Sequence, residues 1–534
     1  MNAIDRNSSK LDDPKNLQWL SIGIFSLYII SLFYKLGVSP LHTEEPRRAI
    51  VALEMLFNNN YVVTSIFNET FYDHPPLWNI ILAGSIKLFG GNAFALRLPA
   101  AVSLILTGLL LYWMNRKYIG QKFALLSSLY YLVCADIYFY FSITAEIDLF
   151  YSLLVVLSIF SIFHFYQKKR LFLLFGGAYF FITLAFFTKG FASFAFLFIT
   201  LFFFLYQQKN LKILFSPAHF TSILLSSIAV GLYFYWYSLH EDLTTYLSDM
   251  WGLTSQRTLL ERDFLELIGH LFFFPLNFLA VLFPATLFIF LWRKEFIQKI
   301  LKHPYLSFVL IAFAANFMVY WVSPEARIRY TYMFFPLVIT LLTYLAYNQL
   351  NKMKLMHLLF KILMGLAIAC CIAIPFLPYF EQIPNIRWTP LFILFLGALL
   401  WMMYKTTDYG KHLGVICFLI VGRLIFDHVA LPLKALNSSS AVQKKYAVEI
   451  ENLIGEEPLY VFSQEDTRTH FQIPFRFYET GAYLELCRQK PLIKTQQCLI
   501  PGYYIFNKNN LEGRKNLLSF NIGDTELVLT YIEN

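Results

Sequence analysis

The sequence predicts a mainly α-helical polytopic membrane protein that ends in a small α/β domain. The chain is 57% hydrophobic and only 14% charged, whereas soluble domains are about half apolar and a quarter charged. About thirteen apolar runs approach the roughly 17–25 residues that a membrane-spanning helix needs. The net charge of +9 is spread over short loops between these runs, which indicates a bilayer and no nucleic-acid partner.

The first apolar run is too long for a typical signal peptide, so it is interpreted as a span. The stretch Leu77–Phe89 is apolar but short, and we expect an interfacial or re-entrant helix there. A membrane domain over 1–432 would contain a long first outer loop at about 36–93. We expect spans near residues 17–35, 94–113, 121–141, 147–166, 171–187, 190–207, 218–238, 270–292, 303–322, 330–348, 357–377, 389–404 and 412–432.

The distribution of charge predicts the orientation. With a cytoplasmic N-terminus, every cytoplasmic loop is rich in Lys or Arg, among them "NRKYIGQK", "QKKR" and "RKEFIQKILKH", as the positive-inside rule requires. An odd number of spans then places the C-terminal domain, 433–534, outside the cytoplasm. The opposite side receives these acids: Glu44, Glu45, Asp73, Glu146, Asp148, Glu241, Asp242, Glu261, Asp263 and Glu325.

The C-terminal segment differs in composition from the rest of the chain. Strand-like runs at 458–462, 502–506 and 526–532 alternate with turn-rich, charged stretches. About a hundred residues suffice for a small α/β domain. Its two cysteines, Cys487 and Cys498, would be able to pair in an oxidising compartment.

The outer loop opens with "HTEEPRRAIVALEML" at 42–56, whose pattern from Glu44 to Met55 predicts a helix on the membrane surface. Capping by Thr43 and acids in the first turn would explain two glutamates, but not two arginines in the same turn. Charged groups far apart in sequence share this outer face. They occur in "FYDHPPLW" (Asp73, His74), "TAEIDLF" (Glu146, Asp148), "TKG" (Lys189), the loop 240–264 (Arg257) and "SPEARIRY" (Arg327, Arg329).

Such a face suits an enzyme acting on an anionic, lipid-linked substrate. Cations hold phosphate, and a carboxylate removes a proton from an attacking group. A transporter or flippase for an anionic lipid is the alternative from another class. It predicts charges deep within spans and two repeated halves, and no half-repeat is visible in the sequence.

The run "EEPRRAIVALEML … YVVTSIFNETFYDHPPLWNIILAGSIKLFGGNAFALRLPAAV" resembles the first periplasmic loop of C-type glycosyltransferases. The resemblance is to the protein O-mannosyltransferase-like group, and in particular to the 4-amino-4-deoxy-L-arabinose lipid A transferases. It implies a GT-C-type fold with a periplasm-facing active site in a bacterial inner membrane. The donor would be a polyprenyl-phosphate-linked sugar and the acceptor lipid A, another glycolipid or glycan, or a protein, with inversion at the sugar.

The resemblance also implies roles for individual residues. The family's catalytic aspartate falls on Glu44, its phosphate-contacting arginine on Arg47 and its later aspartate on Asp148. Two positions depart from the family: Glu44 is one methylene longer than aspartate, and His74 replaces a lysine that helps to hold phosphate. The candidate catalytic residues are Glu44 and Asp148, and the candidate substrate-binding residues are Glu45, Arg47, Tyr72, Asp73, His74, Lys189, Arg257, Arg327 and Arg329. No cofactor is certain, but some relatives hold a divalent metal, for which Asp73, His74 and His270 are weak candidates.

Overall fold

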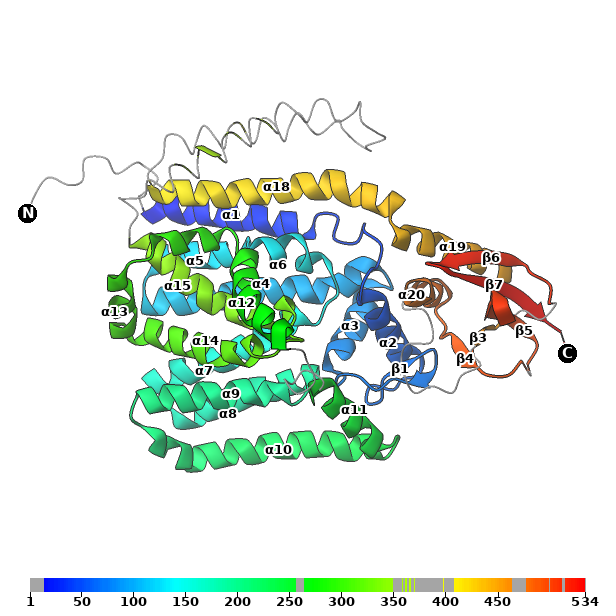
Figure 1. Cartoon of the computed structure of the whole chain (residues 1–534), viewed down its shortest axis with the longest axis horizontal. Coiled ribbons are helices and arrows are strands. Elements are labelled where there is room, and N and C mark those ends of the chain that lie inside the picture. The colour runs from blue at the N-terminus through cyan, green and yellow to red at the C-terminus, as the bar shows by residue number, and fades with distance from the viewer. Residues whose placement is uncertain are drawn as a thin grey trace, which may run out of the picture.

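A computed structural model describes residues 14–255, 264–348, 408–462, 477–498, 500–510 and 514–533, with a few isolated positions between 358 and 397. The part of the chain that it describes forms a helical bundle, an outer cap and a small C-terminal domain (Figure 1). The bundle comprises α1 (Pro14–Phe33), α4 (Ala93–Tyr118), α5 (Gln121–Leu132), α6 (Ala135–Phe139), η2 (Phe141–Ile143), α7 (Asp148–Gln167), α8 (Leu171–Lys189), α9 (Ala192–Gln207), η3 (Leu211–Phe215), α10 (Pro217–Ser238), α12 (Phe264–Val281), η5 (Ala285–Leu291), α13 (Lys294–Lys302), α14 (Pro304–Trp321), η6 (Ile328–Phe334), α15 (Phe335–Tyr347) and α18 (Asp408–Asn437).

The chain is a polytopic membrane protein, but the predicted count of thirteen spans is not confirmed. Among the described residues, seven helices are long and apolar enough to cross a membrane, or nine if two bent pairs each count as one span. α1 and α9 fall where spans were expected, but their apolar stretches are shorter. The expected spans 357–377 and 389–404 lie outside the described residues. Large apolar side chains exposed on α10, such as Phe220 and Leu224, suit contact with lipid tails.

The two bent pairs support each other. α5 meets the segment from Ala135 to Ile143 at an angle of 51°, and the segment from Glu266 to Val281 meets η5 at 112°. The amide of Ala135, at the first break, donates to the carbonyl oxygen of Phe283, at the second, over 2.9 Å. Backbone groups that leave a helix inside a bilayer must find partners within the protein, and the two breaks supply them for one another.

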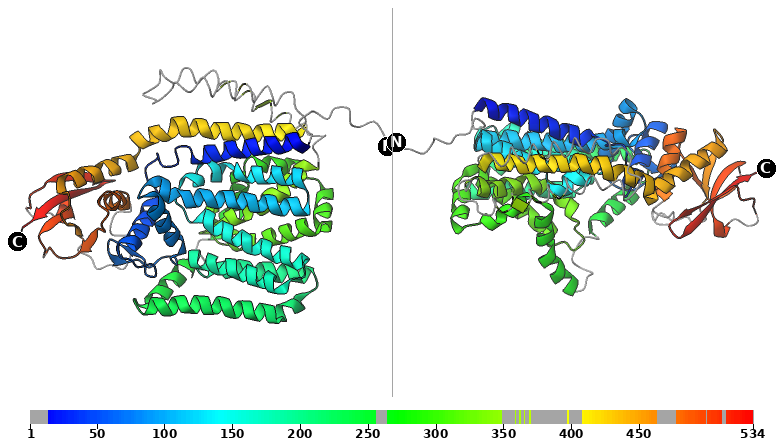
Figure 2. Two further views of the ribbon diagram at one scale, coloured as in Figure 1. Left: turned by 180° about the vertical axis from the view of Figure 1, so that it is seen from behind. Right: turned by 90° about the horizontal axis from the view of Figure 1, so that it is seen from above.

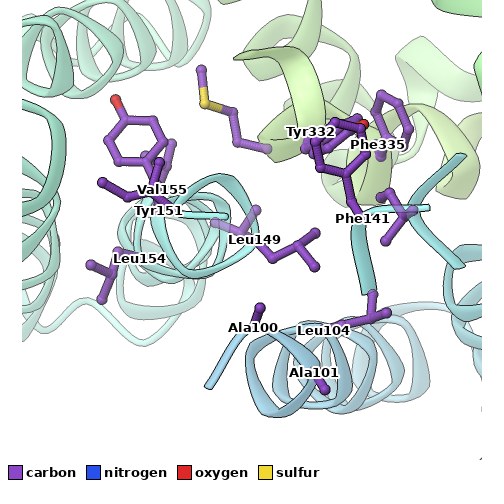
Figure 3. Packing of buried hydrophobic residues seen from close by; sticks show 14 of the residues in the cluster. Ala100, Ala101, Leu104, Phe141, Leu149, Tyr151, Leu154, Val155, Tyr332 and Phe335 are labelled. Carbon is purple, nitrogen blue, oxygen red and sulfur yellow. The ribbon is translucent and has the colours of Figure 1, made fainter. Parts of the chain in front are cut away.

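Tight packing supports the outer end of the bundle. Figure 3 shows Ala100 and Leu104 on the side of α4 that faces Leu149 of α7, with Ala101 on the opposite side of α4 and Phe141 of η2 above Leu104. All five side chains are buried. The small side chain of Ala100 lets α4 approach α7 closely, so the start of α7 is held rigidly against the bundle.

The outer cap contains α2 (Glu45–Phe57), the hairpin β1 (Ser65–Ile66) and β2 (Glu69–Thr70), α3 (Leu77–Phe89) and α11 (Leu243–Ser255). The predicted helices at 44–55 and 77–89 are present. The prediction that the first of these lies on the membrane surface is wrong, because α2 is buried along nearly its whole length. It lies between the bundle and the C-terminal domain in Figure 1 and in both views of Figure 2. Its apolar residues pack on protein, which removes them from both water and lipid.

The C-terminal domain has two helices and a five-stranded mixed sheet. The elements are α19 (Ser439–Ile454), β3 (Leu459–Phe462), α20 (Phe477–Arg488), β4 (Ile493–Thr495), β5 (Gly502–Asn507), η10 (Lys508–Asn510), β6 (Leu518–Ile522) and β7 (Thr525–Ile532). The strand order is β4-β3-β5-β7-β6, with β3 parallel to β4 and β5 and the remaining pairs antiparallel. The three predicted strands are β3, β5 and β7. No disulfide joins Cys487 and Cys498 in the structure, so the suggested pairing is not observed.

The C-terminal domain is docked on the outer cap through specific contacts. Tyr483 of α20 accepts a hydrogen bond from the amide of Leu41 over 2.6 Å, and the Lys494 amide donates to the Phe67 carbonyl oxygen over 3.0 Å. Lys494 also pairs with Glu69 at 2.7 Å. α18 leads into this domain and extends to Asn437, so the predicted boundary after residue 432 lies inside a helix.

Two buried carboxyl groups face each other across this interface. Glu54 of α2 and Glu485 of α20 are both completely inaccessible to solvent. Burial, followed by the nearby Glu54 carboxylate, holds the pKa of Glu485 well above its usual range. Glu54 accepts from Ser65 and from the Asn68 amide, while Glu485 accepts from the Leu492 amide. A neutral Glu485 that donates to an ionised Glu54 satisfies both groups.

Candidate active site

Charged side chains gather where the outer end of the bundle meets the cap. They come from the start of α2, the turn before α3, the segment 144–147, the start of α7, the end of α8 and η6. Several lie close enough for their charges to act on one another, including Glu44, Arg48, Glu146, Asp148 and Arg329. These charged side chains are hereafter called the acidic–basic cluster.

Glu44 and Arg47 form the most accessible pair of the cluster. Glu44 is the residue at the N-terminal end of α2, and Arg47 donates to its Oε2 atom. Both side chains are about one fifth exposed. The Arg47 guanidinium also lies 5.5 Å from the ring centroid of Phe71. The expected cap from Thr43 is wrong: its φ is +57°, and no side chain caps this helix end.

Arg48, Asp73 and His74 form a second group at the rigid "DHPP" turn. Arg48 Nη1 donates to Asp73 Oδ2 over 2.9 Å, and His74 Nδ1 lies 3.7 Å from Asp73 Oδ1. Although burial opposes ionisation, the charges of His74, Arg48 and Arg47 hold the pKa of Asp73 well below its usual range. Asp73 is therefore an anion that holds the cations of this turn in place.

Asp148 and Lys189 form a third pair, made between two spans. Asp148 opens α7, where an anion is favourable against the helix dipole. Lys189 closes α8 and donates to Asp148 Oδ1. The Lys189 ammonium lies about 5 Å from the rings of both Tyr151 and Tyr330. Gly190 follows with a φ of +85°, a left-handed conformation that favours glycine and turns the chain sharply after α8.

Glu146 lies farther from its nearest cation than Glu44, Asp73 and Asp148 do. Its Oε1 atom lies 3.5 Å from Nη1 of Arg329, and its side chain is 5% exposed. Burial and the neighbouring Asp148 raise the pKa of Glu146 to about 7, against the opposing charges of Arg329 and Arg48. At neutral pH the Glu146 carboxyl therefore exists in both protonation states.

Glu45 has a structural set of partners that the sequence analysis did not predict. Arg97, completely buried in α4, grips it through two bonds of 2.8 and 2.9 Å. The remaining N–H groups of Arg97 donate to the carbonyl oxygens of Leu36, Ser39 and Pro40, and the Ala145 amide donates to Glu45 over 2.8 Å. These contacts make Glu45 a residue that holds the loop in place. The signal that was overlooked is an arginine inside an apolar run.

Other predicted site residues lie elsewhere or outside the described chain. Tyr72 packs against the aromatic cluster of α10 and α11, and Arg327 is exposed at the start of η6. His270 contacts the Tyr320 carbonyl oxygen over 3.4 Å. Arg257 lies outside the described residues.

The candidate metal ligands do not form a complete site. Asp73 and His74 are neighbours, but no group of three or more His, Cys, Asp or Glu side chains suited to a metal occurs in the described ranges. The three proposed ligands Asp73, His74 and His270 are thus not assembled, and no step is derived through a metal.

The arrangement combines two chemical capacities. Arg47, Lys189 and Arg329 present positive charge from three separate elements, which suits a phosphate group. Glu44 and Glu146 place carboxylates beside them, which suits an acceptor group that must lose a proton. One cluster with both capacities supports group transfer from a phosphate leaving group.

Comparisons with known proteins match part of the sequence and the whole fold. Residues 73–236 match the family described as "Dolichyl-phosphate-mannose-protein mannosyltransferase". Two relatives are named "Undecaprenyl phosphate-alpha-4-amino-4-deoxy-L-arabinose arabinosyl transferase". The one from Erwinia tasmaniensis is 34% identical over 118 residues, 21% of each chain. The one from Enterobacter sp. (strain 638) is 28% identical over 120 residues, 22% of this chain and 21% of the relative. The aligned region thus spans about one fifth of these relatives.

The solved structures cover nearly the whole chain. ArnT from Cupriavidus metallidurans in the apo state matches 97% of this chain and 98% of that chain, with a TM-score of 0.67 and 14% identity. The same protein bound to undecaprenyl phosphate matches 96% and 98%, with a TM-score of 0.68 and 14% identity. The two chains share one fold from the bundle to the C-terminal domain. This match and the matched segment confirm the predicted resemblance to C-type glycosyltransferases.

Proposed function

We propose that this chain is a membrane glycosyltransferase of the C-type, which moves a sugar from a polyprenyl-phosphate-linked donor to an acceptor at the outer face of the membrane. The observation that carries the proposal is the acidic–basic cluster, which lies in a fold shared with a protein crystallised with undecaprenyl phosphate. The inner membrane of a bacterium is the proposed location, with the N-terminus in the cytoplasm and the C-terminal domain in the periplasm. The acceptor is lipid A, another glycolipid or glycan, or a protein.

In this mechanism the cations bind the donor phosphate and stabilise the charge that develops as it leaves. Arg47 and Lys189 are the central candidates, and Arg329 contributes from η6. Glu44 orients the acceptor group or takes its proton while that group attacks the anomeric carbon from the opposite side, with inversion. Asp148, at the start of α7, holds Lys189 at the end of α8.

His74 and Asp73 lie beside Arg48 in the cluster. His74 replaces the lysine of the family motif, and a neutral imidazole binds phosphate more weakly than an ammonium group. The arginines of α2 and the lysine of α8 therefore carry more of the phosphate binding. Arg327, exposed beside η6, and Arg257 are further candidates for contact with anionic substrate.

The transporter alternative finds little support in the described residues. A charged pair does lie inside a span: Arg423 and Asp427 of α18, both completely buried. They bond to each other one turn apart at 2.7 Å, and Arg423 also donates to Ser142 over 3.0 Å. This pair bonds within α18 and to η2, so it ties α18 to a neighbouring element and gives no path for a substrate.

The test is sugar transfer in proteoliposomes that contain a polyprenyl-phosphate-linked sugar and extracted glycolipid. We expect Glu44→Gln and Asp148→Asn to lower kcat by at least about 100-fold, the usual size of an acid–base or electrostatic contribution. Glu449→Gln, an exposed site on α19, serves as the matched control and keeps full activity. Full activity in the Glu44→Gln protein would remove the role given to that residue.

Mass spectrometry of glycolipids from a deletion strain and its parent identifies the sugar and acceptor together. The expected result is one glycolipid or glycan species that loses the mass of a single sugar in the deletion strain. An unchanged profile of lipids, glycans and glycoproteins would contradict the proposal.

A further inference from the structure

The acidic–basic cluster contains one acid that the motif comparison did not assign, Glu146. It lies in the short segment between η2 and α7, two residues before Asp148. Its neighbours hold it firmly. The Ala145 amide donates to Glu45 of α2, and the Ala145 carbonyl oxygen accepts from Trp78 Nε1 of α3 over 3.3 Å. Both bonds join the segment to the outer cap, so the Glu146 side chain starts from a fixed backbone position.

The other acids of the cluster each have a close cation. Arg47 donates to Glu44, Lys189 donates to Asp148, and Arg48 donates to Asp73 over 2.9 Å. A proton transferred to one of these carboxylates would weaken a charge-assisted hydrogen bond.

The ion pair of Glu146 is looser, since 3.5 Å separates its oxygen from Arg329. It is also crowded by like charge, because Asp148 and Glu44 act on it from α7 and α2. Glu146 is therefore the carboxylate of this cluster for which gaining a proton costs least.

We propose that Glu146 takes the proton of the acceptor group during transfer, which leaves Glu44 the task of orienting that group. This inference rests on the proposed glycosyltransferase function. As the acceptor oxygen bonds to the anomeric carbon, its proton moves to the Glu146 carboxylate. The bond between that carbon and the phosphate oxygen breaks, and its electron pair leaves with the polyprenyl phosphate. The proton then passes to solvent, and the carboxylate is restored.

The charged groups around Glu146 set the pH at which it acts. Asp148 of α7 and Glu44 of α2 favour its protonated form, and Arg329 of η6 and Arg48 of α2 favour the carboxylate. The phenol of Tyr140, between α6 and η2, also lies within reach of its charge. Together with burial these groups place its pKa at about 7. A base must be ionised, so transfer should increase with pH through this value.

The test is the pH profile of kcat/KM for sugar transfer in proteoliposomes, from pH 5 to 9. The parent protein is expected to lose activity below about pH 7, with Glu146 as the group responsible. Glu146→Gln should lower kcat by at least about 100-fold and abolish this dependence, while Glu146→Asp restores part of both. Glu44→Gln should lower the rate but keep the dependence on pH, because the proton acceptor is intact.

A second variant separates a base from a merely structural carboxylate. Arg329→Met removes a charge that favours the ionised form of Glu146, so the acid limb of the profile should move to higher pH. The thermal stability of each variant shows whether it is folded. The donor is a phosphodiester with no second ionisation, but an acceptor phosphate titrates near pH 6. The Glu146→Gln protein shows whether Glu146 or an acceptor phosphate sets the acid limb of the profile, because a limb set by the acceptor would persist in that variant.

Each outcome decides the question. A parent protein that transfers sugar, with a folded Glu146→Gln variant that keeps the acid limb or stays within about threefold of the parent, would overturn the role of Glu146 alone. A folded parent protein that transfers no sugar from any polyprenyl-phosphate donor would overturn the proposed function and this inference together. An upward shift in Arg329→Met and a flat profile in Glu146→Gln would establish the role.

Discussion

Replacing Glu45 by glutamine should destabilise the outer cap more than any single loss of a surface charge. The change keeps the size of the side chain but removes the negative charge that Arg97 grips. Both side chains are completely buried, so water cannot replace the lost partner. Arg97 would remain charged in a site built for an ion pair.

The size of the effect follows from two independent arguments. Breaking a buried ion pair by removing one partner costs about 3–5 kcal/mol. Although burial alone would raise it, Arg97 and His42 lower the pKa of Glu45 from 4.5 to about 2. At 1.36 kcal/mol per pKa unit this corresponds to about 3 kcal/mol in favour of the ionised form. We therefore expect a loss of about 3 kcal/mol.

Thermal unfolding of the purified protein in detergent is a suitable assay. At roughly 2 °C per kcal/mol, the low end for large domains, Glu45→Gln should lower the Tm by about 6 °C. Since the pKa of Glu45 is lowered, its contribution is complete above pH 4.5 and is lost as the pH falls towards 2. The difference between the parent and the variant should therefore be constant from pH 6 to 8.

A double-mutant cycle with Arg97→Met shows whether the two side chains act through each other. The double variant should lose less than the sum of the two single variants, with a coupling of at least about 1 kcal/mol. Glu449→Gln, exposed on α19, is the matched control and should leave the Tm unchanged. A Tm for Glu45→Gln within about 1 °C of the parent, or effects that simply add, would refute this reasoning.

Three further predictions concern other contacts. Lys189→Met should raise the KM for the donor and lower kcat by about 100-fold, because the donor phosphate and Asp148 both lose a cation. Kinetics at saturating donor separate the two effects, and an unchanged KM would contradict phosphate binding by Lys189. Gly481→Ala should loosen the C-terminal domain, since the new Cβ would lie 2.7 Å from ring atoms of Phe67, and limited proteolysis should release that domain faster than in the parent. The pKa of Glu485 is raised, so the stability that this residue contributes is complete below its usual pKa and is lost as the pH rises through the raised value. Glu485→Gln should remove this loss of stability. A Tm that falls equally with rising pH in the parent and the variant would argue against a proton shared by Glu485 and Glu54.

The membrane character and the grouping of charge on one face could be predicted from the sequence. Hydrophobic runs must be buried in lipid or protein, and charge avoids the bilayer core. Glu44, Asp148 and Lys189 therefore had to lie at span ends or in loops, and they do. The helix start at Leu77 and the turn at Gly190 are equally local, because two prolines and one glycine determine them.

Other features depended on contacts between distant segments. Nothing near α2 in the sequence shows that α20 covers it. The sequence therefore predicted a helix on the membrane surface, whereas α2 is buried. The partner of Glu45 is Arg97, 52 residues away, and the partner of Glu146 is Arg329 in another helix. A sequence pattern shows that charges share a side of the membrane, but not which carboxylate each cation holds.

By itself, the sequence determined that the chain is a membrane protein, which end of the bundle carries the charge, and which residue types are available there. Hydropathy, helix length and turn-forming residues act over a few residues, so they can be read in order along the chain. Only the tertiary structure decided which carboxylates of the acidic–basic cluster are held by close cations, and that Glu146 among them has a raised pKa. Burial and the distances between charges set that property, and both arise only when separate helices pack together.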